Sequence, residues 1–82
     1  MGMGKQRVKF TFPRDLVKEP VIYQLGHHFK VVTNIRRADV REDMGWVVLE
    51  LEGEDAEIQR GLAWVSGTGV RVDPVVGDVI EG

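Results

Sequence analysis

The sequence predicts an α+β fold with one antiparallel sheet, and three observations support this prediction. Four β-type segments and two amphipathic helical segments follow one another in the order β-α-β-β-α-β. The connections between them are short, and 82 residues suffice for only one hydrophobic core. Right-handed crossovers then favour a ferredoxin-like βαββαβ sandwich, in which a four-stranded antiparallel sheet carries two helices on one face.

The first strand is predicted over residues 6–12, where hydrophobic and polar residues alternate as in a sheet with one buried face. Pro13 ends this strand because proline cannot donate a ladder hydrogen bond. After a polar connector over residues 14–19, a short helix begins at Pro20, a residue favoured at the first helical position. The apolar stripe of this helix consists of Ile22, Leu25 and Phe29.

The second strand is predicted over residues 30–42, and its hydrophobic pattern changes phase in the middle. Before the change, the residues expected to face inward have odd numbers: Val31, Thr33 and Ile35. After it they have even numbers: Ala38 and Val40. The change falls at Arg36 and Arg37. Either a β-bulge there restores a single inward face, or only half of the strand is buried.

A turn at residues 43–45 leads into the third strand, over residues 46–52. The second helix is predicted to begin with Asp55 as its N-cap and to end at the glycines of residues 67–69. Its core stripe consists of Ile58, Leu62 and Val65. Residues 70–73 form a last short strand.

Because both helices are expected on one face, the other face of the sheet is predicted to be uncovered. The residues predicted on it are Arg7, Lys9, Trp46, Val48, Glu50 and Glu52. Trp46 and Val48 form an apolar spot there, which a monomer would not favour. We therefore predict that these two residues lie at an interface with a second copy or another partner, the alternative being simple partial exposure.

The composition and charge exclude several classes of function. The net charge is 11 − 13 = −2 and the isoelectric point is near 5.6, which argues against a nucleic-acid partner. The absence of cysteine excludes disulfides, thiolate catalysis and cysteine-ligated metals. His27 and His28 point about 100° apart on a helix and cannot ligate one metal together. No hydroxyl nucleophile has an evident base, so we expect no catalysis, no metal and no cofactor.

No hydrophobic run reaches the roughly 20 residues that cross a bilayer, and the N-terminal residues lack the hydrophobic region of a secretory signal. We therefore expect a cytoplasmic protein with no direct membrane insertion.

The segment Asn34-Ile35-Arg36-Arg37 lies at the phase change, on an expected sheet edge. Exposed backbone at such an edge can pair with another chain. The two arginines can bind a carboxylate, the alternative being an ordinary solvated charge pair.

Several segments, in order and at fixed spacing, together resemble one known family. They are Pro20-Val21-Ile22, Val32-Thr33-Asn34-Ile35, Gly45-Trp46, Leu49-Glu50-Leu51-Glu52-Gly53 and Gly69-Val70-Arg71-Val72. The chain resembles the NIL domain over residues 6–76, with residues 1–5 as a flexible N-terminus and residues 77–82 as a C-terminal tail. Where the family has Asn-Ile-Leu, this chain has Asn34-Ile35-Arg36, which is more similar to the branch in which the domain precedes a ferredoxin module.

The resemblance implies an ACT-like domain that self-associates as a homodimer and binds a small amino acid. NIL domains of methionine-importer ATPases bind methionine and inhibit transport. Carried over by position, the ligand-binding residues are Asn34, Ile35, Arg36, Arg37, Ala38 and Val40. In this hypothesis Arg36 or Arg37 pairs with the ligand carboxylate, while the apolar residues contact the ligand side chain.

Two other functions are compatible with the sequence. The domain is a docking module that holds a ferredoxin-type iron–sulfur protein or an enzyme of sulfur assimilation, in which case Trp46 and Val48 matter and small ligands have no effect. Alternatively, it is an enzyme subunit whose active site is completed by another chain.

Overall fold

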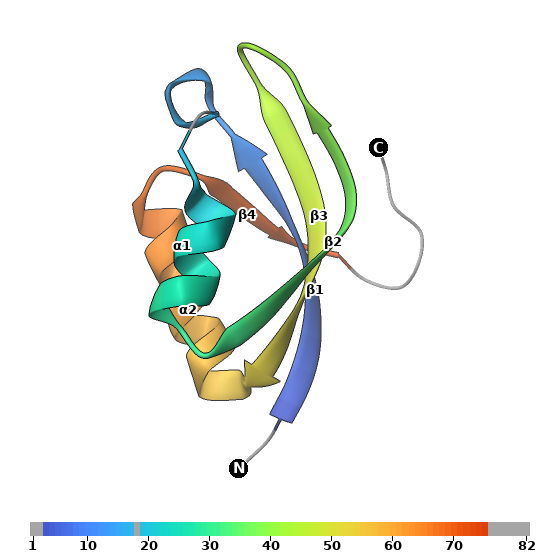
Figure 1. Ribbon diagram of the computed structural model, residues 1–82, viewed down its shortest axis with the longest axis vertical. Helices are drawn as coiled ribbons and strands as arrows, with labels where there is room; N and C mark the ends of the chain where they lie inside the picture. The colour runs from blue at the N-terminus through green and yellow to red at the C-terminus, as the bar shows by residue number, and fades with distance from the viewer. Residues whose placement is uncertain (1–2, 18, 76–82) are drawn as a thin grey trace.

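The computed structural model describes residues 3–17 and 19–75, and its elements follow the predicted order. They are β1 (Met3–Phe12), η1 (Arg14–Leu16), α1 (Val21–His28), β2 (Val31–Val40), β3 (Gly45–Glu54), α2 (Asp55–Gly67) and β4 (Arg71–Pro74). The strands form one antiparallel sheet in the order β2-β3-β1-β4, and both helices cover the same face of it (Figure 1). The predicted ferredoxin-like α+β fold is confirmed.

The strand β1 begins three residues earlier than predicted, because β3 runs on to Glu54 and supplies partners for the added residues. Met3, Gly4 and Lys5 pair with residues 52–54 of β3. These three residues had been assigned to a flexible N-terminal segment, whereas they belong to the sheet. The predicted C-terminal tail, residues 77–82, lies outside the described residues.

The hydrophobic core lies between the helices and the inner face of the sheet. Its buried members are Val8, Phe10, Phe12, Val21, Leu25, Val31, Val47, Leu49, Leu51, Ile58, Leu62, Val65 and Val70. The stripe of α1 differs from the prediction, since Val21 and Leu25 are buried whereas Ile22 and Phe29 are only half-buried. The helix begins at Val21, after Pro20, so the pair at positions i and i+4 faces the core.

The two helices approach closely at Gly61 of α2, which faces Leu25 of α1. A Cβ atom at this position would lie 2.7 Å from Cδ1 of Leu25 and 3.6 Å from Cγ of Phe29. Only glycine therefore allows this distance between the helices. The carboxylate of Glu57 on α2 also accepts a hydrogen bond of 2.9 Å from the backbone N–H of Lys30, which joins α2 to the start of β2.

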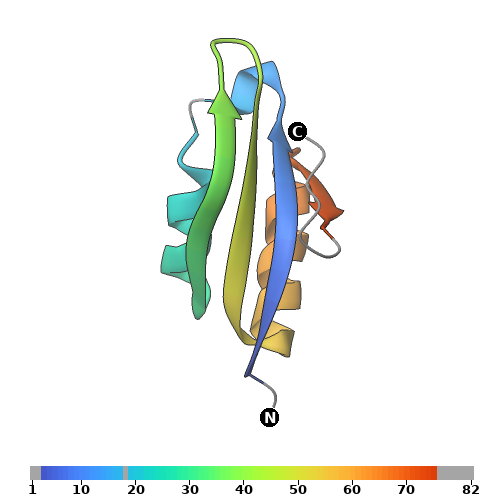
Figure 2. The ribbon, with the colours of Figure 1, turned by 90° about the vertical axis from the view of Figure 1, so that its right-hand side faces the viewer.

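The outer face of the sheet, turned away from the helices, is the face toward the viewer in Figure 2. Trp46 is half-buried there, and the ammonium group of Lys9 lies 5.2 Å from the centroid of its ring. Val48 is 0% exposed, so the prediction that it lies open to solvent is wrong. Val48 pairs with Lys9 on one side and Arg37 on the other, and the aliphatic stems of such long side chains pack along apolar neighbours.

Candidate functional site

A β-bulge in β2 determines which of its residues face the helices. The register with β3 shifts between Ile35 and Arg37, so Arg36 is the extra residue. Ile35 pairs with the buried Leu49, and Ala38 pairs with the buried Val47. The bulge therefore restores one inward face along β2. Of the two predicted alternatives, a bulge or a half-buried strand, the structure has the bulge.

Part of this inward face is nevertheless uncovered. Ile35 is 60% exposed and Val40 is 58% exposed, although both lie on the helix side of the sheet. The cause is a difference in length: β2 has 10 residues, whereas α1 has 8. A strand of that length extends about 33 Å and such a helix only about 12 Å, so α1 leaves one end of β2 open.

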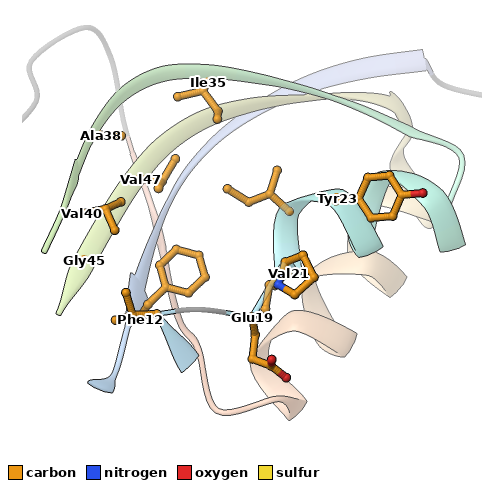
Figure 3. Close-up of a pocket in the computed structure, with 12 residues that line it drawn as sticks. Phe12, Glu19, Val21, Tyr23, Ile35, Ala38, Val40, Gly45 and Val47 are labelled. Atoms are coloured by element: carbon orange, nitrogen blue, oxygen red, sulfur yellow. The ribbon is translucent and has the colours of Figure 1, made fainter. Parts of the chain in front are cut away.

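A pocket of about 270 Å³ lies at this uncovered end, between the start of α1 and the ends of three strands (Figure 3). It is lined by Phe12, Val17, Glu19, Pro20, Val21, Ile22, Tyr23, Ile35, Ala38, Val40, Gly45 and Val47. Among the described residues that line it, Glu19 alone carries a carboxylate, and the remaining walls are almost entirely hydrocarbon. Such walls bind the apolar part of a small ligand by removing its surface from water.

The structure brings together three of the six predicted ligand-binding residues. Ile35, Ala38 and Val40 line the pocket, and they lie on β2 facing α1 in Figure 3. Asn34, Arg36 and Arg37 do not line it. Arg37 pairs with Val48 on the outer face, so within one protomer the guanidinium groups and the apolar pocket are not parts of one site.

Sequence reasoning missed the other half of the pocket. Phe12, Val21 and Tyr23 come from β1 and α1, distant in sequence from β2. The position of Pro20 immediately before a short helix is the signal that locates the start of α1 beside the open strand.

The free edge of the sheet runs beside this pocket. β2 is the outermost strand, with β3 as its only neighbour in the sheet formed by the described residues. The backbone groups of an edge strand that point away from its neighbour have no ladder partner. They lie within reach of a ligand or of a strand from another chain.

The adjacent histidines take part in ring contacts on the helix layer. The His27 ring stacks on Tyr23 at a centroid distance of 5.7 Å, and the His28 ring lies 6.0 Å from that of Trp64. Within residues 3–17 and 19–75, no group of three or more histidine, aspartate and glutamate side chains is arranged to hold a metal ion. In the same residues, neither helix has the length and hydrophobicity that crossing a bilayer requires.

Comparison with solved structures supports the fold. The C-terminal domain of an ABC transporter/ATP-binding protein from Enterococcus faecalis superimposes with a TM-score of 0.76. The match covers 89% of this chain and 86% of that chain, at 17% sequence identity.

Two curated relatives share sequence with the chain. Methionine import ATP-binding protein MetN 1 from Enterococcus faecalis is 29% identical over 77 residues, which are 89% of this chain and 22% of the relative. Methionine import ATP-binding protein MetN from Helicobacter pylori is 30% identical over 69 residues, which are 79% of this chain and 21% of the relative. The chain thus spans about a fifth of the length of these relatives.

The family comparison covers most of the fold. The model of the NIL domain matches residues 6–74, from within β1 to the last residue of β4. The placement in the ferredoxin-fused branch stays a prediction. The extent of the match shows that the chain belongs to the NIL domain family.

Proposed function

We propose that this chain is a non-catalytic regulatory domain that binds methionine or a related sulfur amino acid. The observation that carries the proposal is the apolar pocket beside the bulge, because it joins Ile35, Ala38 and Val40 to the start of α1. Its volume of about 270 Å³ lies just below the range of pockets for drug-sized ligands, which suits a single amino acid. The relatives named as methionine import proteins support the same ligand class.

The pocket divides the ligand into two parts. The hydrocarbon and thioether portion enters the pocket, where the described walls are almost entirely hydrocarbon and favour an apolar terminal group. The amino and carboxylate groups stay at the mouth, beside the free edge of β2. Unpaired backbone groups at residues 34–36 bind them there, which gives Asn34 and Arg36 a role through their main chain.

Self-association through the same edge completes the proposal. Val32, Ile35 and Val40 on β2 are each more than half exposed, and burial of such residues against a second copy is favourable. A homodimer of this kind extends the sheet and covers the open end of the pocket. Trp46, on the outer face of the sheet, is not part of this dimer contact.

Titration calorimetry with three amino acids of similar length tests the ligand class. Methionine and norleucine share an unbranched, largely apolar side chain, whereas glutamine ends in an amide. The apolar walls predict saturable binding of methionine, binding of norleucine within about tenfold of it, and binding of glutamine that is weaker by at least about tenfold.

A pair of variants locates the binding. Ala38→Phe places a ring in the pocket and is expected to abolish methionine binding. Ala63→Phe, at an exposed position of α2, is the matched control and leaves binding unchanged. Absence of heat for all three amino acids with the unmodified chain would favour the docking module instead, and equal binding by both variants would place the ligand elsewhere.

A further inference from the structure

A cluster of basic side chains lies on the outer face of the sheet, near the turn between β2 and β3. We define this basic patch as Lys9, Arg36, Arg37, Arg41, Met44 and Trp46. It is separate from the ligand pocket, because Lys9 and Arg37 both pair with Val48, a residue outside the core between sheet and helices.

The strand register brings these residues together across three strands. Lys9 of β1 and Arg37 of β2 flank Val48 of β3. Trp46 precedes Val48 by two residues and therefore lies on the same face of β3. The bulge adds Arg36 immediately before Arg37 at the free edge. Without it, one fewer guanidinium would be present at this end of the sheet.

The charge of the patch is opposite in sign to that of the whole chain. Arg36 and Arg37 are exposed, and neither makes an ion pair with any residue in the part of the chain that the structure describes. Arg41 is compensated by Asp39, with a guanidinium nitrogen 3.3 Å from a carboxylate oxygen. Uncompensated positive charge therefore gathers here on a chain whose net charge is −2.

A hollow of about 300 Å³ adjoins these charges. It is lined by Asp39, Arg41, Met44 and Trp46, and Met44 is 52% exposed. Tryptophan, methionine and arginine are the residues enriched in protein–protein interfaces, where a few buried anchors supply most of the affinity. Met44 and Trp46 form the apolar wall of the hollow, opposite the Asp39–Arg41 ion pair, and one apolar side chain of a partner can pack against that wall.

We propose that the basic patch docks an acidic segment of a partner protein. Carboxylates of the segment pair with Arg36 and Arg37, and an apolar side chain of the segment enters the hollow beside Trp46. A nucleic-acid backbone is disfavoured because Glu50 and Glu52 lie further along the same face of β3 and limit the length of the positive surface that a long phosphate backbone would need. The short extent of the positive charge suits a few carboxylates rather than a long polyanion.

An NMR titration with a synthetic peptide tests this proposal. The probe is an acetylated and amidated glutamate-rich peptide with one central leucine, added at low ionic strength. The indole N–H signal of Trp46 is expected to shift saturably, whereas that of Trp64 stays in place, because Trp64 packs against Phe29 and His28 in the helix layer. Added salt should weaken the binding.

Charge-removal variants supply the control. Arg36→Gln/Arg37→Gln is expected to weaken peptide binding by about tenfold or more. Arg14→Gln/Lys30→Gln removes the same charge from exposed positions outside the patch and should leave the affinity within about twofold. Equal weakening in both variants would overturn the proposal, as would an unchanged Trp46 signal. Equivalent shifts with inorganic phosphate alone, or tighter binding of an oligothymidylate, would also overturn it.

Discussion

Ile35 and Ala38 line one pocket although three positions separate them in a strand, a spacing that normally places two side chains on opposite faces. The bulge at Arg36 resolves this, because its extra residue restores the inward direction before Ala38. The same residue adds a positive charge at the free edge. The bulge therefore accommodates one further basic residue, while the pocket residues on either side of it keep the same face.

Deletion of Arg36 should remove the bulge but keep the pocket and the fold. Without the extra residue, Ile35, Arg37 and Ala38 alternate regularly and keep Leu49, Val48 and Val47 as partners, so Ala38 and Val40 still face the helices. We expect methionine affinity within about threefold of that of the unmodified chain, and a change of less than about 1 kcal/mol in the free energy of unfolding because the deleted residue is exposed. Calorimetry and urea unfolding measure the two effects.

Arg36→Ala is the control for this deletion, since it removes the charge but keeps the extra residue. It should retain the register and bind methionine within about threefold of the unmodified chain. Loss of methionine binding in the deletion variant, with binding kept in Arg36→Ala, would contradict the register that places Ile35 and Ala38 on one face.

Val48 and Val32 lie on the same face of neighbouring strands and should respond differently to truncation. Val48→Ala removes buried methyl groups and should lower the free energy of unfolding by roughly 1–3 kcal/mol. Val32→Ala, at a position 57% exposed, should change it by less than about 0.5 kcal/mol. Similar values from denaturant unfolding would show that Val48 is not buried in solution.

Gly61→Ala should destabilise the domain although alanine favours helices. The added methyl group meets Leu25, which is 0% exposed and closely packed, so relief requires movement of the core. We expect a net loss of about 1–2 kcal/mol in the free energy of unfolding, measured by thermal or urea unfolding.

Gly67→Ala provides the matched comparison at the end of the same helix. No atom lies within 4 Å of the position of its added Cβ, and its φ is not positive. The substitution should be neutral or stabilising by up to about 1 kcal/mol. A stabilised Gly61→Ala variant would show that the helices can separate without cost.

Much of the fold was predictable because its elements have clear periodicities. Alternation identified the strands, and the change of parity between Ile35 and Ala38 indicated the bulge. The burial of Val48 was not predictable in the same way. Alternation tells on which face of the sheet a residue lies, but not whether side chains on the adjacent strands cover it.

The candidate site was predictable only on the β2 side. Ile35, Ala38 and Val40 were predicted from the family resemblance and line the pocket, whereas Phe12 and Tyr23 join them through tertiary structure alone. Arg37 lies away from the pocket because of the face on which its side chain emerges after the bulge. The order of residues in the sequence does not determine that face.

An amide-resolved NMR titration shows whether methionine binds in the pocket between β2 and α1. We expect saturable shifts in residues 34–40 of β2, in the start of α1 near Val21 and at Phe12, with the amides of β4 unaffected. Ala38→Phe should abolish these shifts. A flat response at millimolar methionine, or shifts confined to the outer face around Trp46, would contradict a methionine-binding pocket in this domain.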